Sequence, residues 1–219
     1  MNSGMPPPPP PLPPSSMHAF ELAGAAFCAL VQQVPAHRWG DHGLGDWDLR
    51  ALVGHAGRAL ITVVEYLGQA GDEPAQLTDA AAYFATATRL MPADQLNESV
   101  RVRGVQAGAL LGKDPAATVR GWLTDAVDAL HGTPGDPVVP TVVGRMPLSA
   151  YLPSRTFELT VHGLDLAAAL GVDAEWPEAA LNETIRLAGD VAVQTGNATT
   201  VLRALTGRRS LPEGFSVLP

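Results

Sequence analysis

The sequence has a single cysteine, Cys28, in a chain of 219 residues, and this scarcity excludes an intramolecular disulfide. Because Cys28 stands in an apolar run, we expect a small buried core residue rather than a reactive thiol. A low cysteine content is typical of proteins in a reducing compartment and favours the cytoplasm. Stability then has to come from a hydrophobic core, which a chain of this length can bury without covalent cross-links.

Long apolar segments are missing too, because no run approaches the roughly 20 residues that a membrane span needs. The N-terminus lacks the basic start and apolar stretch of a secretory signal peptide. Lys113 is the one lysine among 14 basic residues, which stand against 22 acidic ones and give a net charge of −8. An acidic chain repels phosphate backbones, so we expect neither nucleic-acid nor membrane binding. Arginine in place of lysine, with many alanines, favours a bacterial source.

Proline is concentrated at the N-terminus, where the run from Pro6 to Pro14 is broken only by Leu12. Proline has no N–H and a fixed φ, so residues 1–16 are predicted to form an extended, disordered tail. Such a tail is favoured over a ligand for domains with aromatic grooves. Helical spacing begins at Met17, and we predict one helical domain over residues 17–209, followed by an irregular tail over residues 210–219.

Apolar residues recur at three- and four-residue spacing along most of this domain, which is typical of amphipathic helices. Asp46 or Asp48 is the expected N-cap of the second helix, and Asp114 that of the fifth. Residues 133–147 contain four prolines and predict a loop, with a short strand pair as one option. Convincing strand alternation is absent, so the predicted fold class is all-α, a helix bundle. The expected helices span residues 17–34, 48–67, 79–91, 93–111, 115–131, 149–170 and 177–205.

The helix over residues 149–170 concentrates polar side chains on one face. Counting about 100° per residue from Glu158 places His162 about 40° away and Asp165 about 20° to the other side. Arg155 and Tyr151 fall within about 60° on the same count, whereas the rest of the helix is apolar. Buried charges need partners or a metal ion. Glu158 and His162 can point at one ion, and a catalytic zinc site usually has three protein ligands.

His55 is the third candidate ligand, because it stands among core-type residues of an amphipathic helix and needs a partner there. The remaining histidines lie where we expect exposed, solvated or capping side chains: His18, His37, His42 and His131. A Glu–His pair at four-residue spacing also occurs as a simple ion pair. The spacing alone therefore leaves two interpretations open, a metal site and a satisfied core histidine.

Three motifs, in order along the chain, resemble one known family. Residues 47–55, Trp-Asp-Leu-Arg-Ala-Leu-Val-Gly-His, resemble the second-helix signature of mycothiol-dependent maleylpyruvate isomerase N-terminal domains. Residues 155–166 resemble the second motif of that family, and residues 203–208 its closing motif. The family belongs to the DinB-like superfamily, so the resemblance implies a four-helix bundle with additional short helices. It also implies that His55, Glu158 and His162 hold a divalent metal, with zinc preferred.

The resemblance further implies a metal-dependent transferase or isomerase. Mycothiol or another small thiol would be held as thiolate and used on a small electrophilic substrate, for S-transfer or isomerisation. Arg155 is expected to bind a substrate carboxylate or the thiol cofactor, with an ion pair to Glu158 or Asp165 as the alternative. Asp165 is expected to orient a ligand histidine.

A second function class stays open. The isomerase itself continues into a second domain, whereas this chain stops at Pro219, which favours a non-catalytic metal-binding regulator or sensor of the same fold. A homodimer is compatible with such bundles, although no self-complementary apolar stripe stands out. We expect Tyr151 to pack with its hydroxyl at the rim of the site, and Trp47 and Trp122 to be core anchors.

Overall fold

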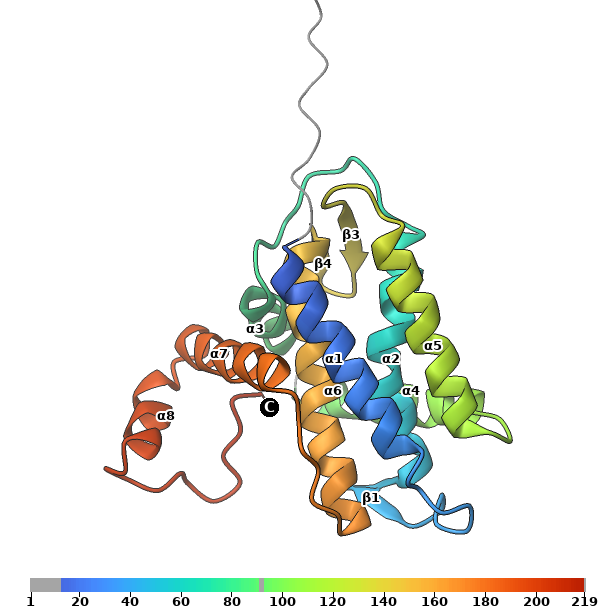
Figure 1. Cartoon of the computed structure of the whole chain (residues 1–219). Coiled ribbons are helices and arrows are strands. Elements are labelled where there is room, and N and C mark those ends of the chain that lie inside the picture. The colour runs from blue at the N-terminus through green and yellow to red at the C-terminus, as the bar shows by residue number, and fades with distance from the viewer. Residues whose placement is uncertain (1–12, 91–92, 219) are drawn as a thin grey trace, which may run out of the picture.

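The structure is a computed structural model that describes residues 13–90 and 93–218. Four of its helices form a bundle (Figure 1). The first helix packs against the fifth and the sixth, and the second packs against the same two, so the four enclose one core. The predicted all-α class is confirmed. These four helices are α1 (Pro14–Val31), α2 (Leu49–Leu67), α5 (Pro115–His131) and α6 (Leu148–Leu170).

Additional elements surround the bundle. Of these, α4 packs along α2, and α7 packs against α6 and α3. Two antiparallel hairpins complete the described chain, β1 with β2 and β3 with β4. The further helices are α3 (Ala80–Leu90), α4 (Ala93–Leu110), α7 (Glu178–Gln194) and α8 (Ala198–Leu205). The strands are β1 (His42–Leu44), β2 (Trp47–Asp48), β3 (Val138–Thr141) and β4 (Gly144–Pro147).

The helix ends follow the capping chemistry of the sequence. Of the two aspartates before α2, Asp48 is the N-cap, and its carboxylate accepts a hydrogen bond from Ala51 N–H at 2.7 Å. Asp114 caps α5 in the same way, through Ala117 N–H at 3.0 Å. Gly171 ends α6 with a φ of 74°, a left-handed conformation that glycine adopts without the steric cost of a Cβ.

Three expectations differ from the structure. The first helix begins at Pro14, so residues 14–16 of the expected tail belong to α1, because proline is tolerated in a first turn; residues 1–12 lie outside the described chain. The helix expected over 177–205 is two helices, separated at Gly196, whose φ of 78° interrupts the right-handed path. The β1–β2 hairpin lies where we expected only a loop, whereas the strand pair within 133–147 is confirmed.

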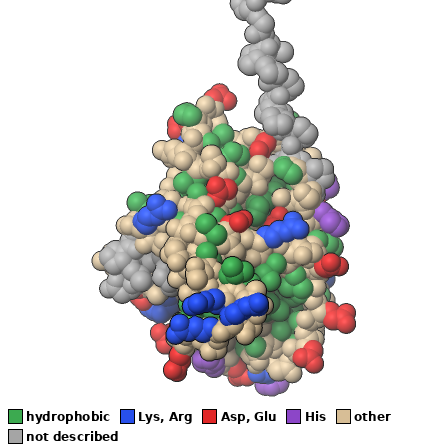
Figure 2. All heavy atoms as spheres, turned by 90° about the vertical axis from the view of Figure 1, so that its left-hand side faces the viewer, with side chains coloured by type: hydrophobic (Ala, Val, Ile, Leu, Met, Phe, Trp, Pro, Cys, Tyr) green, Lys and Arg blue, Asp and Glu red, His purple; other side chains and the backbone are tan. Residues whose placement is uncertain are grey.

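The core fills the space between the four bundle helices. Phe20 and Phe27 of α1 and Leu52 and Leu60 of α2 belong to this core, and all four are completely buried. Outside the core, α7 and α8 keep apolar side chains exposed, and Figure 2 shows hydrophobic and basic side chains together on that side of the molecule. None of the helices in the described chain combines the length and the apolarity needed to cross a bilayer.

Cys28 is buried, with 6% of its surface exposed, as the sequence predicts. Burial raises the pKa of its thiol to about 11, so the reactive thiolate is scarce at neutral pH. We expect N-ethylmaleimide to label Cys28 of the native protein at pH 7.5 at least about 100-fold more slowly than Cys28 of the protein unfolded in urea. Mass spectrometry of timed aliquots measures this ratio, and comparable native and unfolded rates would contradict the burial.

Candidate metal centre

Two helices of the bundle bring the three predicted ligands together. His55 comes from α2, and Glu158 and His162 lie one turn apart on α6. His55 Nε2 is 3.3 Å from Glu158 Oε2, and His162 Nε2 is 3.4 Å from the same oxygen. One ligand atom from each residue lies within 4.8 Å of the other two, and the three side chains keep 15–18% of their surface exposed. The cluster is partly buried but reachable.

This arrangement fits a divalent ion. Zinc ligands at about 2.0–2.1 Å in a tetrahedron lie about 3.3–3.4 Å from one another, which is the separation of the carboxylate oxygen from both imidazole nitrogens. Two neutral imidazoles and a carboxylate are also a donor set that suits zinc and similar ions. Within the residues that the structure describes, no other group of three or more such side chains meets this test.

The histidines expected to be exposed are exposed, and none of them approaches the cluster. His131 Nε2 lies 2.7 Å from Glu21 Oε1, in a surface pair between α5 and α1. His42 Nε2 lies 3.0 Å from the carbonyl oxygen of Gly45. The structure thus separates His55 and His162 from the rest as the sequence reasoning did.

Electrostatics keep the carboxylate ionised and one imidazole neutral. Burial opposes ionisation of Glu158, but the neighbouring imidazoles outweigh it and hold the pKa well below its usual range. Burial lowers the pKa of His55, which leaves the neutral form that ligates metals. Burial also disfavours charge on His162, yet the carboxylates of Asp165 and Glu158 raise its pKa to about 9.

Further side chains orient the two histidines. Asp165 Oδ2 lies 3.0 Å from His162 Nδ1, so the carboxylate fixes the ring with Nε2 directed at Glu158. The indole ring of Trp47 lies against His55, with ring centroids 4.6 Å apart, and its Nε1 donates to Arg101 O. Trp47 is buried as expected, and it also positions a candidate ligand. His55 Nδ1 is buried without a hydrogen-bond partner among the described residues.

The substitution Asp165→Asn is expected to weaken zinc binding by about 10–100-fold, because the amide supports the tautomer and orientation of His162 less well than the carboxylate. Titration against a chromogenic zinc chelator measures the affinity. Asp173→Asn is the matched control, since Asp173 is an exposed acid just beyond the end of α6. Equal affinities for the two variants would remove Asp165 from this positioning role.

Arg155 makes neither of the ion pairs that we considered. Its side chain is 7% exposed, and its guanidinium lies over the rings of Tyr151 and Tyr83, 4.6 and 5.6 Å from their centroids. Its Nε donates to Ser154 Oγ at 3.1 Å. Among the described residues no carboxylate lies within 4.0 Å of it. A buried cation stacked on aromatic rings and facing a cavity is suited to an anionic ligand.

Tyr151 differs from our expectation. The whole residue is buried, and its hydroxyl donates to Thr62 Oγ1 at 2.9 Å instead of reaching the rim of the site. The reason is the close packing of α6 on α2, which places a hydroxyl acceptor opposite the phenol. A buried Tyr hydroxyl requires such a partner. Tyr151 thus fixes the stacking surface for Arg155.

The three candidate ligands line a cavity of about 550 Å³, together with Arg155, Trp47 and Asp165. Sequence reasoning missed several of its lining residues. The sequence could have predicted Arg58, since it lies three residues after His55 and hence on the same side of α2. Arg103 of α4 could not be found this way, because the packing of α4 on distant segments, mainly α2, brings it to the cavity.

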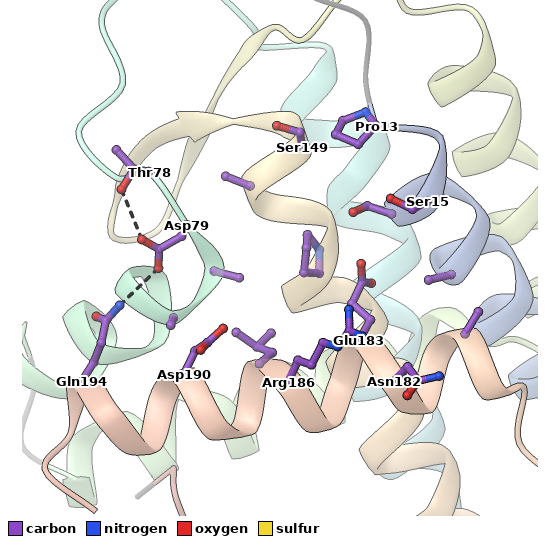
Figure 3. Close-up of a pocket in the computed structure, with 18 of the residues that line it drawn as sticks. Pro13, Ser15, Thr78, Asp79, Ser149, Asn182, Glu183, Arg186, Asp190 and Gln194 are labelled. Atoms are coloured by element: carbon purple, nitrogen blue, oxygen red, sulfur yellow. Dashed lines mark hydrogen bonds between the residues drawn. The ribbon is translucent and has the colours of Figure 1, made fainter. Parts of the chain in front are cut away.

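A second, larger cavity of about 940 Å³ lies between α7 and the first turns of α1, α3 and α6 (Figure 3). Some of its polar groups already form hydrogen bonds within the protein. Asp79 caps α3 by accepting from Ala82 N–H, and it also accepts a hydrogen bond from Gln194. Burial raises the pKa of Glu183, which points into this cavity in Figure 3. None of the described residues that line it is a histidine or a cysteine.

Comparison with protein families supports the motif resemblance. Residues 20–167 match the family described as the mycothiol maleylpyruvate isomerase N-terminal domain, and this segment includes all three candidate ligands and Arg155. Searches of curated proteins and of solved structures found no match. The matched segment covers more than half of the chain and runs from α1 to the second half of α6. The chain therefore belongs to the mycothiol maleylpyruvate isomerase N-terminal domain family.

Proposed function

We propose that the protein is a zinc-dependent enzyme of the mycothiol-dependent maleylpyruvate isomerase type, which uses a small thiol on an electrophilic, anionic substrate. The observation that carries this proposal is the position of Arg155, a buried cation in the same cavity as the three metal-ligand candidates. The cytoplasm is the proposed location, because small thiols stay reduced there.

Each side chain of the site would have a distinct role. His55, Glu158 and His162 would hold the ion, which leaves a coordination position for a ligand and would keep a bound thiol ionised near neutral pH. Asp165 and Trp47 would hold the two imidazoles in place. Arg155 would bind a carboxylate of the substrate and orient its reactive carbon toward the thiol sulfur.

The reaction we propose needs no oxidant or reductant. The thiol loses its proton to solvent, and its sulfur forms a bond to the electrophilic carbon of a conjugated double bond. The electron pair of that double bond forms a new double bond to the carbonyl carbon, and the carbonyl π pair moves to the oxygen, where the charge of Arg155 stabilises the enolate. The former carbon–carbon double bond is now single, so rotation about it is possible. The electron pair then returns to this bond and restores the double bond, while the C–S bond breaks. The thiolate is released unchanged beside the isomerised product.

An open cavity supports catalysis over the alternative of a regulator or sensor. A structural zinc site usually has four protein ligands, whereas the cluster of described residues here has three and borders about 550 Å³ of space. That volume is within the range of small-molecule sites. A regulatory metal module of the same fold remains the second candidate, and it predicts metal binding without thiol binding.

The substitution Arg155→Lys is expected to lower kcat/KM by about 100-fold, mainly through KM, because lysine cannot form the two-pronged contact with a carboxylate. The assay uses the zinc-loaded protein with mycothiol and maleylpyruvate, followed by the loss of substrate absorbance. Arg186→Lys is the matched control, since Arg186 is exposed on α7. Zinc-loaded wild type that neither binds mycothiol by calorimetry nor turns over substrate would support the regulatory alternative instead.

A further inference from the structure

The chain beyond α8 returns to the metal-site cavity. Residues 207–218, which we call the C-terminal strap, contain no helix or strand. Figure 1 shows this segment leaving α8 and ending near α6 and α7. Ser216 and Leu218 line the same cavity as His55, Glu158 and His162. The strap lies outside the family match, which covers residues 20–167.

In the described part of the chain, apolar side chains hold the end of the strap against the body. Val217 and Leu218 are half-buried and pack against the core, whereas residues 210–214 are exposed. Every hydrogen bond of residues 210–218 within the described chain stays inside the strap: Phe215 N–H donates to Pro212 O, and Leu218 N–H donates to Ser216 Oγ. Residues 207–209 are tied to the end of α8, where the N–H groups of Arg208 and Arg209 donate to Arg203 O. Residues 210–218 have no hydrogen bond to the rest of the described chain, so they open at a lower cost than a helix of the bundle.

The strap also has backbone positions that allow movement. Gly207 and Gly214 both have a φ of 68°, and no atom lies within 4 Å of the place where a Cβ would be. Glycine changes conformation more freely than other residues, so the two positions can act as hinges. Two other lining residues of the cavity, Leu44 and Val142, are apolar and exposed to 38% and 64%.

We propose that the strap is a movable wall of the substrate site, and that Leu218 closes it. In the closed state, Leu218 shields the cavity from water beside the metal ligands and Arg155. In the open state, the strap admits a small molecule, and Ser216 and Leu218 then contact it and limit its size. The inference relies on the proposed function only for what enters the cavity, and the movement itself is independent of metal and thiol.

The test measures access to the cavity in metal-free protein, so it succeeds or fails separately from the enzymatic proposal. Ala59 lines the cavity and is 1% exposed, which makes Ala59→Cys a reporter that N-ethylmaleimide reaches through the cavity. Adding Leu218→Asp is expected to speed labelling of this cysteine by about tenfold or more, because a charged side chain keeps the strap open. Leu211→Asp is the control, since Leu211 lies on the strap, is 47% exposed and does not line the cavity.

Cys28 serves as an internal test of folding, because it is labelled only if the core opens. Peptide mapping distinguishes the two cysteines. If Leu218→Asp exposes Cys28, the milder Leu218→Ala takes its place in the same comparison. Unchanged labelling of Ala59→Cys in a folded Leu218 variant would overturn the proposal, and so would equal acceleration by Leu211→Asp.

Discussion

Replacement of His162 by alanine is expected to abolish stoichiometric metal binding. The wild-type protein should retain about one zinc ion per chain after dialysis, and the variant close to none, because loss of one of three ligands leaves a site too weak to compete with buffer. His162 also connects Asp165 to the cluster, so its removal takes away that carboxylate's role as well. Mass spectrometry of metals in tag-free protein measures the content.

Thermal unfolding gives a second readout of the same substitution. Zinc at about 100 times its dissociation constant should stabilise the wild type by about 2.7 kcal/mol, because it binds the native state and not the unfolded chain. The His162→Ala variant should show no zinc-dependent change in Tm. His131→Ala is the control, since His131 is an exposed histidine far from the cluster. Wild-type protein that is folded and binds no divalent ion, even with zinc in excess, would refute the metal site.

The largest effect on stability is expected for Gly54→Ala. Gly54 faces the backbone of α4, and a Cβ at this position would lie 2.2 Å from Gly108 N and 2.6 Å from Ala107 C. Backbone atoms cannot move aside as a side-chain end can, so the two helices would have to separate. We expect a loss of about 3 kcal/mol or more in the free energy of unfolding. Urea unfolding of the metal-free protein measures this without a contribution from zinc.

Gly121→Ala is the matched control for Gly54→Ala. Gly121 is an exposed residue inside α5, with no atom within 4 Å of a Cβ built there. Alanine has the higher helix propensity, so this substitution is expected to stabilise the protein by up to about 1 kcal/mol. The two glycine variants should therefore move the urea midpoint in opposite directions. A Gly54→Ala variant as stable as wild type would mean that α2 and α4 lie further apart than the structure places them.

Much of the fold follows from local patterns. Three- and four-residue spacing located the bundle helices, because one face of each helix has to enter the core. Asp48, Asp114 and Gly171 set helix ends through capping chemistry that depends on a few neighbouring residues. Apolar spacing did not predict the break between α7 and α8 at Gly196, because that spacing continues on both sides of the glycine and does not depend on its backbone conformation.

The sequence by itself determined the residue types of the candidate metal centre. Glu158 and His162 had to share a helix face at their spacing, and His55 was an imidazole among core residues. Only the tertiary structure decided that α2 and α6 bring these three side chains together, that Arg155 stacks on Tyr151 and Tyr83, and that the C-terminal strap reaches the cavity. The reason is that spacing fixes directions around one helix axis, whereas contacts between distant segments depend on how closely the helices pack, as at Gly54 and Gly108.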